Sequence, residues 1–378
     1  MVALLSPGQG SQSAGMLTPW LALAGAPETV ARWSELAALD LVAAGTTWSD
    51  DAIRDTAVAQ PLLTAAALLS ARALLGEQRP DAVCGHSIGE LPALAIAGVF
   101  TDDEAIVLAA LRGRAMAAAT QLAPSGMAAV LGGDADAVQV AAEQHGLEVA
   151  TVNVAGQVVL GGPVAALDAL AAAPPAGARV RRLDVAGAFH TSAMTPARSE
   201  FDAALAALTP APPHTTVIAN RDGAILSDGR EALQRLGDQL TSAVRFDLCL
   251  STLAGLGVQG VVELAPGGTL TAVAKRALPG VELVPLRTPD DLPGARALLH
   301  LAGEHLPVGW RALPSPDSGI VDQLINLGDA VDVGTPVAVV SGRSGASTIV
   351  APVPGTLTEW LVTAGDPVRA GQLLAVLS

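Results

Sequence analysis

The chain has 378 residues, which at roughly 150 residues per domain predicts two or three domains, and 51% of them are apolar, so a large core can be buried. Its 21 Lys and Arg against 36 Asp and Glu leave a net charge of −15, and its aromatic residues are 4 Phe, 5 Trp and no Tyr. Binding a nucleic-acid backbone needs an excess of positive charge, and stacking single-stranded bases needs aromatic rings, so we expect no nucleic-acid partner.

The sequence also gives little support for a disulfide-rich, metal-binding or membrane protein. The two cysteines, Cys84 and Cys249, are too few for a disulfide framework or a four-thiolate zinc site, and we expect both to pack in the core. The six histidines show no metal-ligand spacing, so no metal site is expected. The apolar run at residues 2–5 is too short for a signal peptide, and runs such as 91–100 stop at about ten residues, below the roughly 18 that span a membrane. These features predict a cytoplasmic protein with no membrane span.

The first chemical signal follows two short strands. Residues 2–5 predict a buried strand that enters a Gly-rich turn, and helical periodicity dominates from about 26 to 76. A second strand is predicted at 81–84, directly before Gly85-His86-Ser87-Ile88-Gly89 and a helical run to about residue 97. Strand, sharp turn and helix are typical of a nucleophile elbow, in which glycines permit an unusual backbone and the helix N-terminus supports an oxyanion. The alternative is that Ser87 only caps the helix. The local sequence favours neither the nucleophile nor the cap.

The middle of the chain changes pattern between residues 126 and 187. The periodicity predicts, in order, a strand at 128–131, a helix at 135–145, strands at 148–154 and 157–161, a helix at 164–172 and a strand at 179–185. This βαββαβ order is that of a ferredoxin-like unit. We therefore expect an α/β core formed by residues 1–125 and 188–312, with a ferredoxin-like subdomain at 126–187 inserted into it.

The last part of the chain, residues 313–378, contains an internal repeat. Five residues recur 37 positions later: Leu324, Gly328, Asp329, Val331 and Gly334 return as Leu361, Gly365, Asp366, Val368 and Gly371. Each copy has the pattern of a strand, a Gly-Asp turn and a second strand. Two such copies predict a small, pseudo-symmetric all-β barrel.

Six motifs in order carry a resemblance over about residues 1–290. They are Gly8-Gln9-Gly10-Ser11-Gln12, Gly85-His86-Ser87-Ile88-Gly89-Glu90, Arg112-Gly113, Asn153 with Gln157-Val158-Val159, Ala188-Phe189-His190-Thr191, and Glu263 with Pro266-Gly267. In this order they resemble the bacterial malonyl-CoA:acyl carrier protein transacylases of fatty acid synthesis, a family with a hydrolase-like α/β core and an inserted ferredoxin-like unit.

The resemblance implies a role for each motif residue. Ser87 would be the nucleophile, His190 its general base and acid, and Arg112 the anchor for the malonyl carboxylate. The backbone N–H groups of Gln9 and Ile88 would stabilise the oxyanion. A backbone carbonyl would orient the histidine, and the resemblance assigns that carbonyl to Arg245.

The resemblance also implies a substrate and partners. Phe189 and Asn153 would line the substrate pocket, and Phe before the histidine is the residue found in malonyl-selective rather than methylmalonyl-selective relatives. Malonyl-CoA would donate the acyl group and acyl carrier protein would accept it, with no cofactor bound. Because both the chain and typical carrier proteins are acidic, docking would depend on local basic groups, for which the candidates are Arg179, Arg181, Arg182, Lys275 and Arg276.

Other functions compete with this one. A serine thioesterase or hydrolase would share the Gly-x-Ser-x-Gly motif but leaves Arg112 unexplained and wants an acidic triad member between Ser and His. A transacylase subunit of a malonate decarboxylase or polyketide system would use the same chemistry with another carrier. A docking protein without activity would not need an intact Ser87, His190 and Arg112.

The tail resembles a second family, the biotinyl and lipoyl barrels, through residues 349–356 and 365–371. In that family the cofactor is attached to a lysine at a hairpin tip, which here falls at about Ser344. Because Lys275 is the only lysine of the chain, we expect neither biotin nor lipoate on the barrel. A docking or packing module and a passive appendage are both consistent with this.

Overall fold

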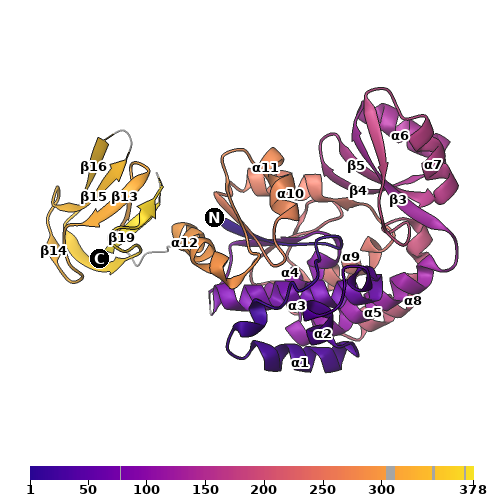
Figure 1. Cartoon of the computed structure of the whole chain (residues 1–378), viewed down its shortest axis with the longest axis horizontal. Helices are drawn as coiled ribbons and strands as arrows, with labels where there is room; N and C mark the ends of the chain where they lie inside the picture. Colours follow the sequence, from indigo (N-terminus) through magenta and orange to yellow (C-terminus); the bar gives the residue numbers. More distant parts are fainter. Residues whose placement is uncertain (77, 304–310, 343–344, 370–371) are drawn as a thin grey trace. The chain divides into compact units, whose positions relative to one another are not determined.

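The computed structural model describes residues 1–76, 78–303, 311–342, 345–369 and 372–378 (Figure 1). Contacts between residues divide the chain into two compact units, Met1–Arg296 and Ala297–Ser378. The division falls inside helix α12 (Leu292–Gly303), upstream of the boundary at 312 that the composition suggests.

The first unit is built on a six-stranded sheet in the order β11-β10-β1-β2-β7-β8. Its strands are β1 (Val2–Ser6), β2 (Ala82–Gly85), β7 (Thr216–Ile218), β8 (Ile225–Leu226), β10 (Gly260–Glu263) and β11 (Glu282–Pro285). All neighbouring pairs are parallel except β7 with β8. Every residue of β1, β2 and β10 is buried, as expected for parallel strands covered on both faces.

Helices cover both faces of this sheet (Figure 1). One face carries α10 (Phe246–Gly255) and α11 (Thr269–Ala277), which share a buried cluster with β1, β2 and β10 that contains both cysteines. The other helices of the core are α1 (Ala26–Ala37), α2 (Leu41–Thr46), α3 (Thr56–Leu75), α4 (Glu90–Ile96), α5 (Asp102–Thr120), α8 (Thr195–Ala206) and α9 (Gly229–Gln239). Single 3-10 turns lie at Trp20–Ala22, Ala52–Arg54, Ser87–Gly89, Ser192–Met194 and Pro289–Asp291.

Helix α3 is the one described helix whose length and apolar composition would suffice to cross a membrane. However, 78% of its apolar window is buried inside the structure. It packs most extensively against α5, so its composition is explained by a place in the protein core.

The inserted subdomain has the predicted βαββαβ order. Its elements are β3 (Ser125–Gly132), α6 (Ala135–Gln144), β4 (Glu148–Val154), β5 (Gln157–Pro163), α7 (Val164–Ala172) and β6 (Ala178–Arg182). The strands pair in the order β6-β3-β5-β4, and α6 and α7 bury their apolar sides against this sheet. Strand β9 (Val244–Arg245) of the core extends the sheet by pairing with β4, which ties the insert to the core. The predicted ferredoxin-like insertion is confirmed.

The second unit contains two four-stranded sheets, β12-β19-β17-β14 and β16-β15-β13-β18, around one apolar cluster. Its strands are β12 (Arg311–Pro314), β13 (Gly319–Gln323), β14 (Ala330–Val331), β15 (Pro336–Gly342), β16 (Gly345–Val350), β17 (Gly355–Trp360), β18 (Pro367–Val368) and β19 (Leu373–Leu377). The predicted small all-β domain is therefore present.

The sequence repeat of this unit is also a structural repeat. In one copy the Asp329 carboxylate accepts the backbone N–H of Asn326 at 2.7 Å, and in the other Asp366 accepts that of Thr363 at 2.8 Å. The β15–β16 register pairs Gly342 with Gly345. The predicted hairpin tip at Ser344 lies outside the described residues.

Candidate active site

The turn after β2 forms the predicted elbow. Ser87 has a φ of 55°, a left-handed conformation that non-glycine residues rarely adopt. The flanking glycines are needed for steric reasons: a Cβ on Gly85 would lie 2.0 Å from the carbonyl group of Gly89, and one on Gly89 would lie 2.1 Å from the carbonyl oxygen of Ser6. The ends of β1 and β2 and the turn that leads into α4 therefore approach too closely for a side chain at position 85 or 89.

His190 meets Ser87 from the segment after the inserted subdomain. The Ser87 Oγ to His190 Nε2 distance is 2.6 Å, and His190 Nδ1 lies 2.8 Å from the carbonyl oxygen of Gln239. Because a carbonyl oxygen only accepts, Nδ1 carries the proton and Nε2 presents its lone pair to the serine hydroxyl. This is the tautomer that a general base requires.

The carbonyl that orients the histidine belongs to Gln239, so the assignment to Arg245 is wrong. Gln239 is the last residue of α9, where carbonyl groups lack a partner within the helix and are available to other donors. Arg245 is engaged elsewhere: its backbone N–H donates to the carbonyl oxygen of Asn220 at 2.7 Å, and its guanidinium pairs with Asp247 at 2.8 Å.

The environment keeps the imidazole neutral. Burial, followed by the positive charge of Arg112, lowers the pKa of His190 to about 3. At neutral pH the ring is therefore unprotonated and able to accept the serine proton.

Arg112 of α5 extends its side chain to the serine. Its side chain is 1% exposed, and its Nη2 lies 3.4 Å from Ser87 Oγ. Nη1 donates to Oε1 of Gln60 at 2.8 Å and Nη2 to Oε1 of Gln239 at 2.7 Å. Burial lowers its pKa to about 10, so the guanidinium is still charged at neutral pH. Within the described part of the chain, no carboxylate lies within ion-pair distance of it.

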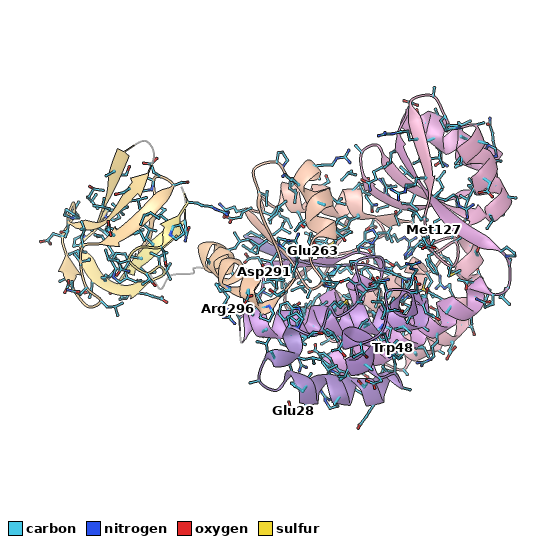
Figure 2. The ribbon with its side chains drawn as sticks, in the orientation of Figure 1. Glu28, Trp48, Met127, Glu263, Asp291 and Arg296 are labelled. Carbon is cyan, nitrogen blue, oxygen red and sulfur yellow. The ribbon has the colours of Figure 1, made fainter. Side chains whose placement is uncertain are left out.

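Ser87 and His190 line a cavity of about 230 Å³ between the core and the inserted subdomain. Met127 of β3, which is labelled in Figure 2, belongs to the wall that the insert provides. The remaining walls come from the Gly8-Gln9 turn, the turn after β2, α3, α5, β4, β5, the segment after β6, and α11. The cavity is therefore bounded by segments far apart in sequence.

Three of the other predicted site residues lie at this cavity. Gln9, Asn153 and Phe189 line it, and Phe189 is 6% exposed. The Gln9 side-chain amide donates to the hydroxyl of Thr56 at 3.1 Å, and the side-chain Oδ1 of Asn153 accepts from His86 Nε2 at 3.0 Å. Ile88 is buried directly after the nucleophile. Asn153 and Phe189 thus lie where the resemblance expects pocket residues, and the oxyanion function of Gln9 and Ile88 remains a prediction.

Four polar residues of the site were not anticipated from the sequence: Gln60, Glu90, Asn220 and Gln239. Asn220 accepts the backbone N–H of Ser87 at 2.8 Å, and its own backbone N–H donates to Glu90 at 2.7 Å. The Gln239 amide donates to Glu90 and to the carbonyl oxygen of Ser87. Burial raises the pKa of Glu90 to about 7. Glu90 ends the elbow motif, which was the only sequence signal for this network.

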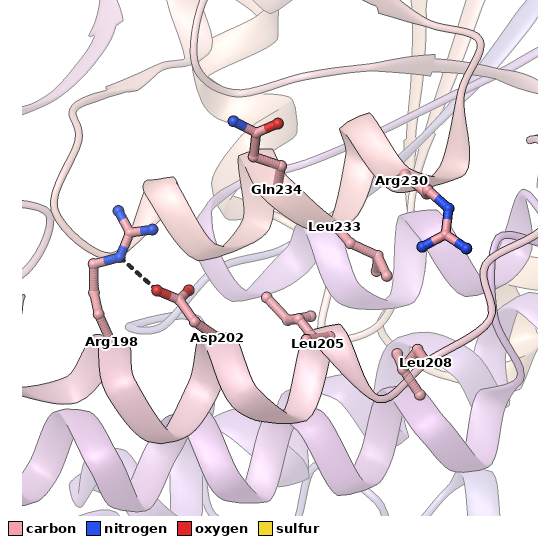
Figure 3. Close-up of a pocket in the computed structure, with 8 residues that line it drawn as sticks. Arg198, Asp202, Leu205, Leu208, Arg230, Leu233 and Gln234 are labelled. Carbon is pink, nitrogen blue, oxygen red and sulfur yellow. Dashed lines mark hydrogen bonds and ion pairs between the residues drawn. The ribbon is translucent and has the colours of Figure 1, made fainter.

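A second cavity, of about 280 Å³, lies between α8 and α9 (Figure 3). Two of its charged side chains pair with each other, since Arg198 donates to the carboxylate of Asp202 at 3.1 Å. The described residues that line it include no Ser, Cys or His. It therefore lacks the nucleophile and base found in the first cavity.

Comparison with known proteins agrees with this geometry. The family model of the acyl transferase domain matches residues 4–299. The malonyl CoA-acyl carrier protein transacylase of Mycobacterium tuberculosis is 50% identical over 296 residues, which cover 77% of this chain and 98% of that protein.

Solved structures lead to the same family. The crystal structure of MCAT from Mycobacterium tuberculosis has a TM-score of 0.76 at 49% identity and covers 78% of this chain and 99% of that one. A malonyl-transacylase in complex with its type II polyketide acyl-carrier protein has a TM-score of 0.73 at 28% identity, covering 78% of this chain and 98% of that one. The chain therefore belongs to the acyl transferase domain family and, within it, to the malonyl-CoA:acyl carrier protein transacylases.

Proposed function

We propose that this protein transfers the malonyl group of malonyl-CoA to the phosphopantetheine thiol of acyl carrier protein, through a malonyl-serine intermediate, and so supplies fatty acid synthesis. One observation carries the proposal. The hydroxyl of Ser87 lies 2.6 Å from a neutral imidazole and 3.4 Å from a buried guanidinium, so nucleophile, base and carboxylate anchor meet at one point.

In the first half-reaction, His190 Nε2 takes the proton of Ser87 as Oγ bonds to the thioester carbon. The carbonyl oxygen becomes an oxyanion, for which we assign the backbone N–H groups of Gln9 and Ile88 as donors. When the carbon–sulfur bond breaks, the CoA sulfur takes the proton from His190. The malonyl group remains on Ser87 as an ester.

In the second half-reaction, the carrier thiol gives its proton to His190 and its sulfur attacks the ester carbon. The carbon–oxygen bond then breaks, and Oγ recovers the proton from His190. Because the same imidazole acts as base and acid in both halves, no metal or cofactor is needed in this scheme.

Substrate choice depends on charge and shape. A planar guanidinium can bind a carboxylate through two parallel hydrogen bonds, so Arg112 favours malonyl over neutral acyl groups. Phe189 lines the cavity next to His190, where its ring would crowd a methyl branch on the second carbon. We therefore assign malonyl rather than methylmalonyl as the preferred group.

We assign the docking site for the carrier protein to the surface near α11. This helix supplies Thr269, Leu270 and Val273 to the cavity wall, and its exposed Lys275 and Arg276 lie at its C-terminal end. Arg276 also donates to Gln157 of the insert at 3.4 Å, and Gln157 itself lines the cavity. Local basic groups at the cavity thus offset the net acidity of the chain, and we place the reaction in the cytoplasm. Arg179 and Arg181 of β6 are exposed, whereas Arg182 pairs with Asp168.

Intact-mass spectrometry after brief mixing with malonyl-CoA, without carrier protein, tests the proposal. The expected result is one malonyl adduct per chain, located on Ser87 by peptide mapping. Addition of fatty acid or polyketide carrier proteins in parallel then identifies which carrier discharges the adduct. Release of free malonate without a detectable adduct or transfer would instead indicate a hydrolase.

A further inference from the structure

Arg112 is held in place by neutral groups. Its two terminal nitrogens donate to the amide oxygens of Gln60 and Gln239, at 2.8 and 2.7 Å. Both glutamines are buried, with 1% and 5% of their surface exposed. A buried guanidinium usually pairs with a carboxylate, because an isolated charge away from water is unfavourable. The site therefore needs a counter-charge somewhere nearby.

Above about pH 7, where its carboxyl group is ionised, Glu90 supplies the counter-charge without touching Arg112. The Gln239 amide connects the two: its oxygen accepts from Arg112, and its nitrogen donates to Glu90. The other oxygen of Glu90 accepts the backbone N–H of Asn220 at 2.7 Å, so both carboxylate oxygens have donors. Burial leaves Arg112 and Glu90 sensitive to each other's charge across the amide.

We propose that Gln60 and Gln239 are positioning residues that set the preference for malonyl groups, by holding Arg112 with neutral oxygens while its counter-charge, Glu90, stays one amide away. The inference rests on the proposed function. A carboxylate in direct contact would have to be displaced by the malonyl carboxylate, and charge-assisted hydrogen bonds are about twice as strong as neutral ones. Amide oxygens orient the guanidinium equally well and give way to an incoming carboxylate at lower cost.

Gln60 allows a test that leaves the rest of the network in place. Its amide nitrogen contacts only the sulfur of Met116, at 3.3 Å, among the partners found in the described residues. Gln60→Glu therefore changes one atom and converts a neutral acceptor of Arg112 into an anionic one. Gln60→Met removes the acceptor at similar size, without a new charge. Gln144→Glu makes the same change of charge on the exposed end of α6 and is the matched control.

The experiment measures kcat and KM for malonyl-CoA and acetyl-CoA at pH 8, with thermal melting to monitor the fold. For Gln60→Glu we expect the malonyl-to-acetyl ratio of kcat/KM to fall by about tenfold or more, mainly through a higher KM for malonyl-CoA. For Gln60→Met, which leaves Arg112 held by Gln239 alone, the ratio should fall by only about threefold, and for Gln144→Glu it should match the parent. An unchanged ratio in Gln60→Glu, or an equal loss in Gln60→Met, would overturn the proposal.

A second variant covers the case in which Gln60→Glu does not fold. Gln60→Glu combined with Glu90→Gln keeps one carboxylate in the buried network but brings it into contact with Arg112. The same fall in the ratio is expected, and a parent-like ratio in this variant would contradict the inference. Failure of the parent protein to form any malonyl adduct is a separate result, which would count against the proposed function itself.

Discussion

Ser87 and His190 face each other from two strained backbone positions, with φ values of 55° and 61°. Left-handed conformations of such residues are unfavourable by about 1–3 kcal/mol each and persist only where neighbouring contacts enforce them. Here Asn220 binds the N–H of Ser87 and Gln239 binds its carbonyl group, while Gln239 also orients His190. The side-chain amides of Asn220 and Gln239 thus stabilise the backbone geometry on which the chemistry depends.

The covalent step gives the first prediction. Ser87→Ala should abolish the malonyl adduct and transfer to the carrier, because it removes the hydroxyl that lies 2.6 Å from His190 Nε2. His190→Ala should retain a trace of transfer, since the oxyanion donors remain. Adduct formation by intact mass and carrier malonylation are the measurements. Parent-like transfer by Ser87→Ala would exclude the covalent mechanism.

Arg112→Ala gives the second prediction. Malonyl transfer should fall strongly, because removing one partner of a buried charge pair typically costs about 3–5 kcal/mol. Acetyl transfer should be retained or should rise, since an acetyl group has no carboxylate to anchor. The ratio of kcat/KM for the two CoA esters is the measurement. An equal loss of both activities would show that Arg112 is structural.

The third prediction concerns the ionisation of His190. Because burial and Arg112 lower its pKa to about 3, the neutral ring should persist as the pH falls through 6.5, where an ordinary histidine takes up a proton. Nitrogen NMR of histidine-labelled protein should therefore show His190 in the Nδ1–H tautomer at pH 5. Protonation of His190 near pH 6.5 would contradict the assignment.

At the scale of elements, the elbow depends on how closely β1, β2 and α4 approach. Gly89→Ala should be severely destabilising, because its Cβ would lie 2.1 Å from a backbone oxygen of β1 that cannot move without disturbing the sheet. Gly255→Ala, in α10, is the matched control, since a Cβ there meets no atom within 4 Å. We expect that change to be neutral or stabilising. Urea denaturation of both variants is the measurement, and similar midpoints would contradict the steric argument.

The elements with a strong periodic pattern could be predicted from the sequence, and those set by tertiary contacts could not. The βαββαβ insert was located to within a few residues, because its strands and helices alternate with clear turns. The partner of His190 was misassigned because a backbone carbonyl has no side-chain signature, and its choice depends on where α9 ends. Gln60 could not be predicted for a related reason. The role of a glutamine in an apolar helix depends on its tertiary contact with an arginine of α5, which the sequence does not show.

For the whole molecule, the family relationship covers the first unit and leaves the second to be explained. The family model ends at residue 299, whereas β12 to β19 lie beyond it. The second unit has its own apolar cluster, formed by residues of both its sheets. Every residue described as lining the catalytic cavity belongs to the first unit. The chemistry therefore does not require a side chain from the second unit.

Removal of residues 313–378 should leave malonyl transfer to free carrier protein largely intact. The Ser87, His190 and Arg112 contacts all lie within residues 1–296, and the family model is matched before the deleted segment begins. Any loss should appear in oligomeric state or in complex formation, measured by size-exclusion chromatography with light scattering. Because the only lysine is Lys275 of α11, the purified full-length chain should also show no biotin or lipoyl mass increment. Loss of the acyl-enzyme on deletion would show that the second unit takes part in the chemistry, and such an increment would contradict the expectation of an unmodified chain.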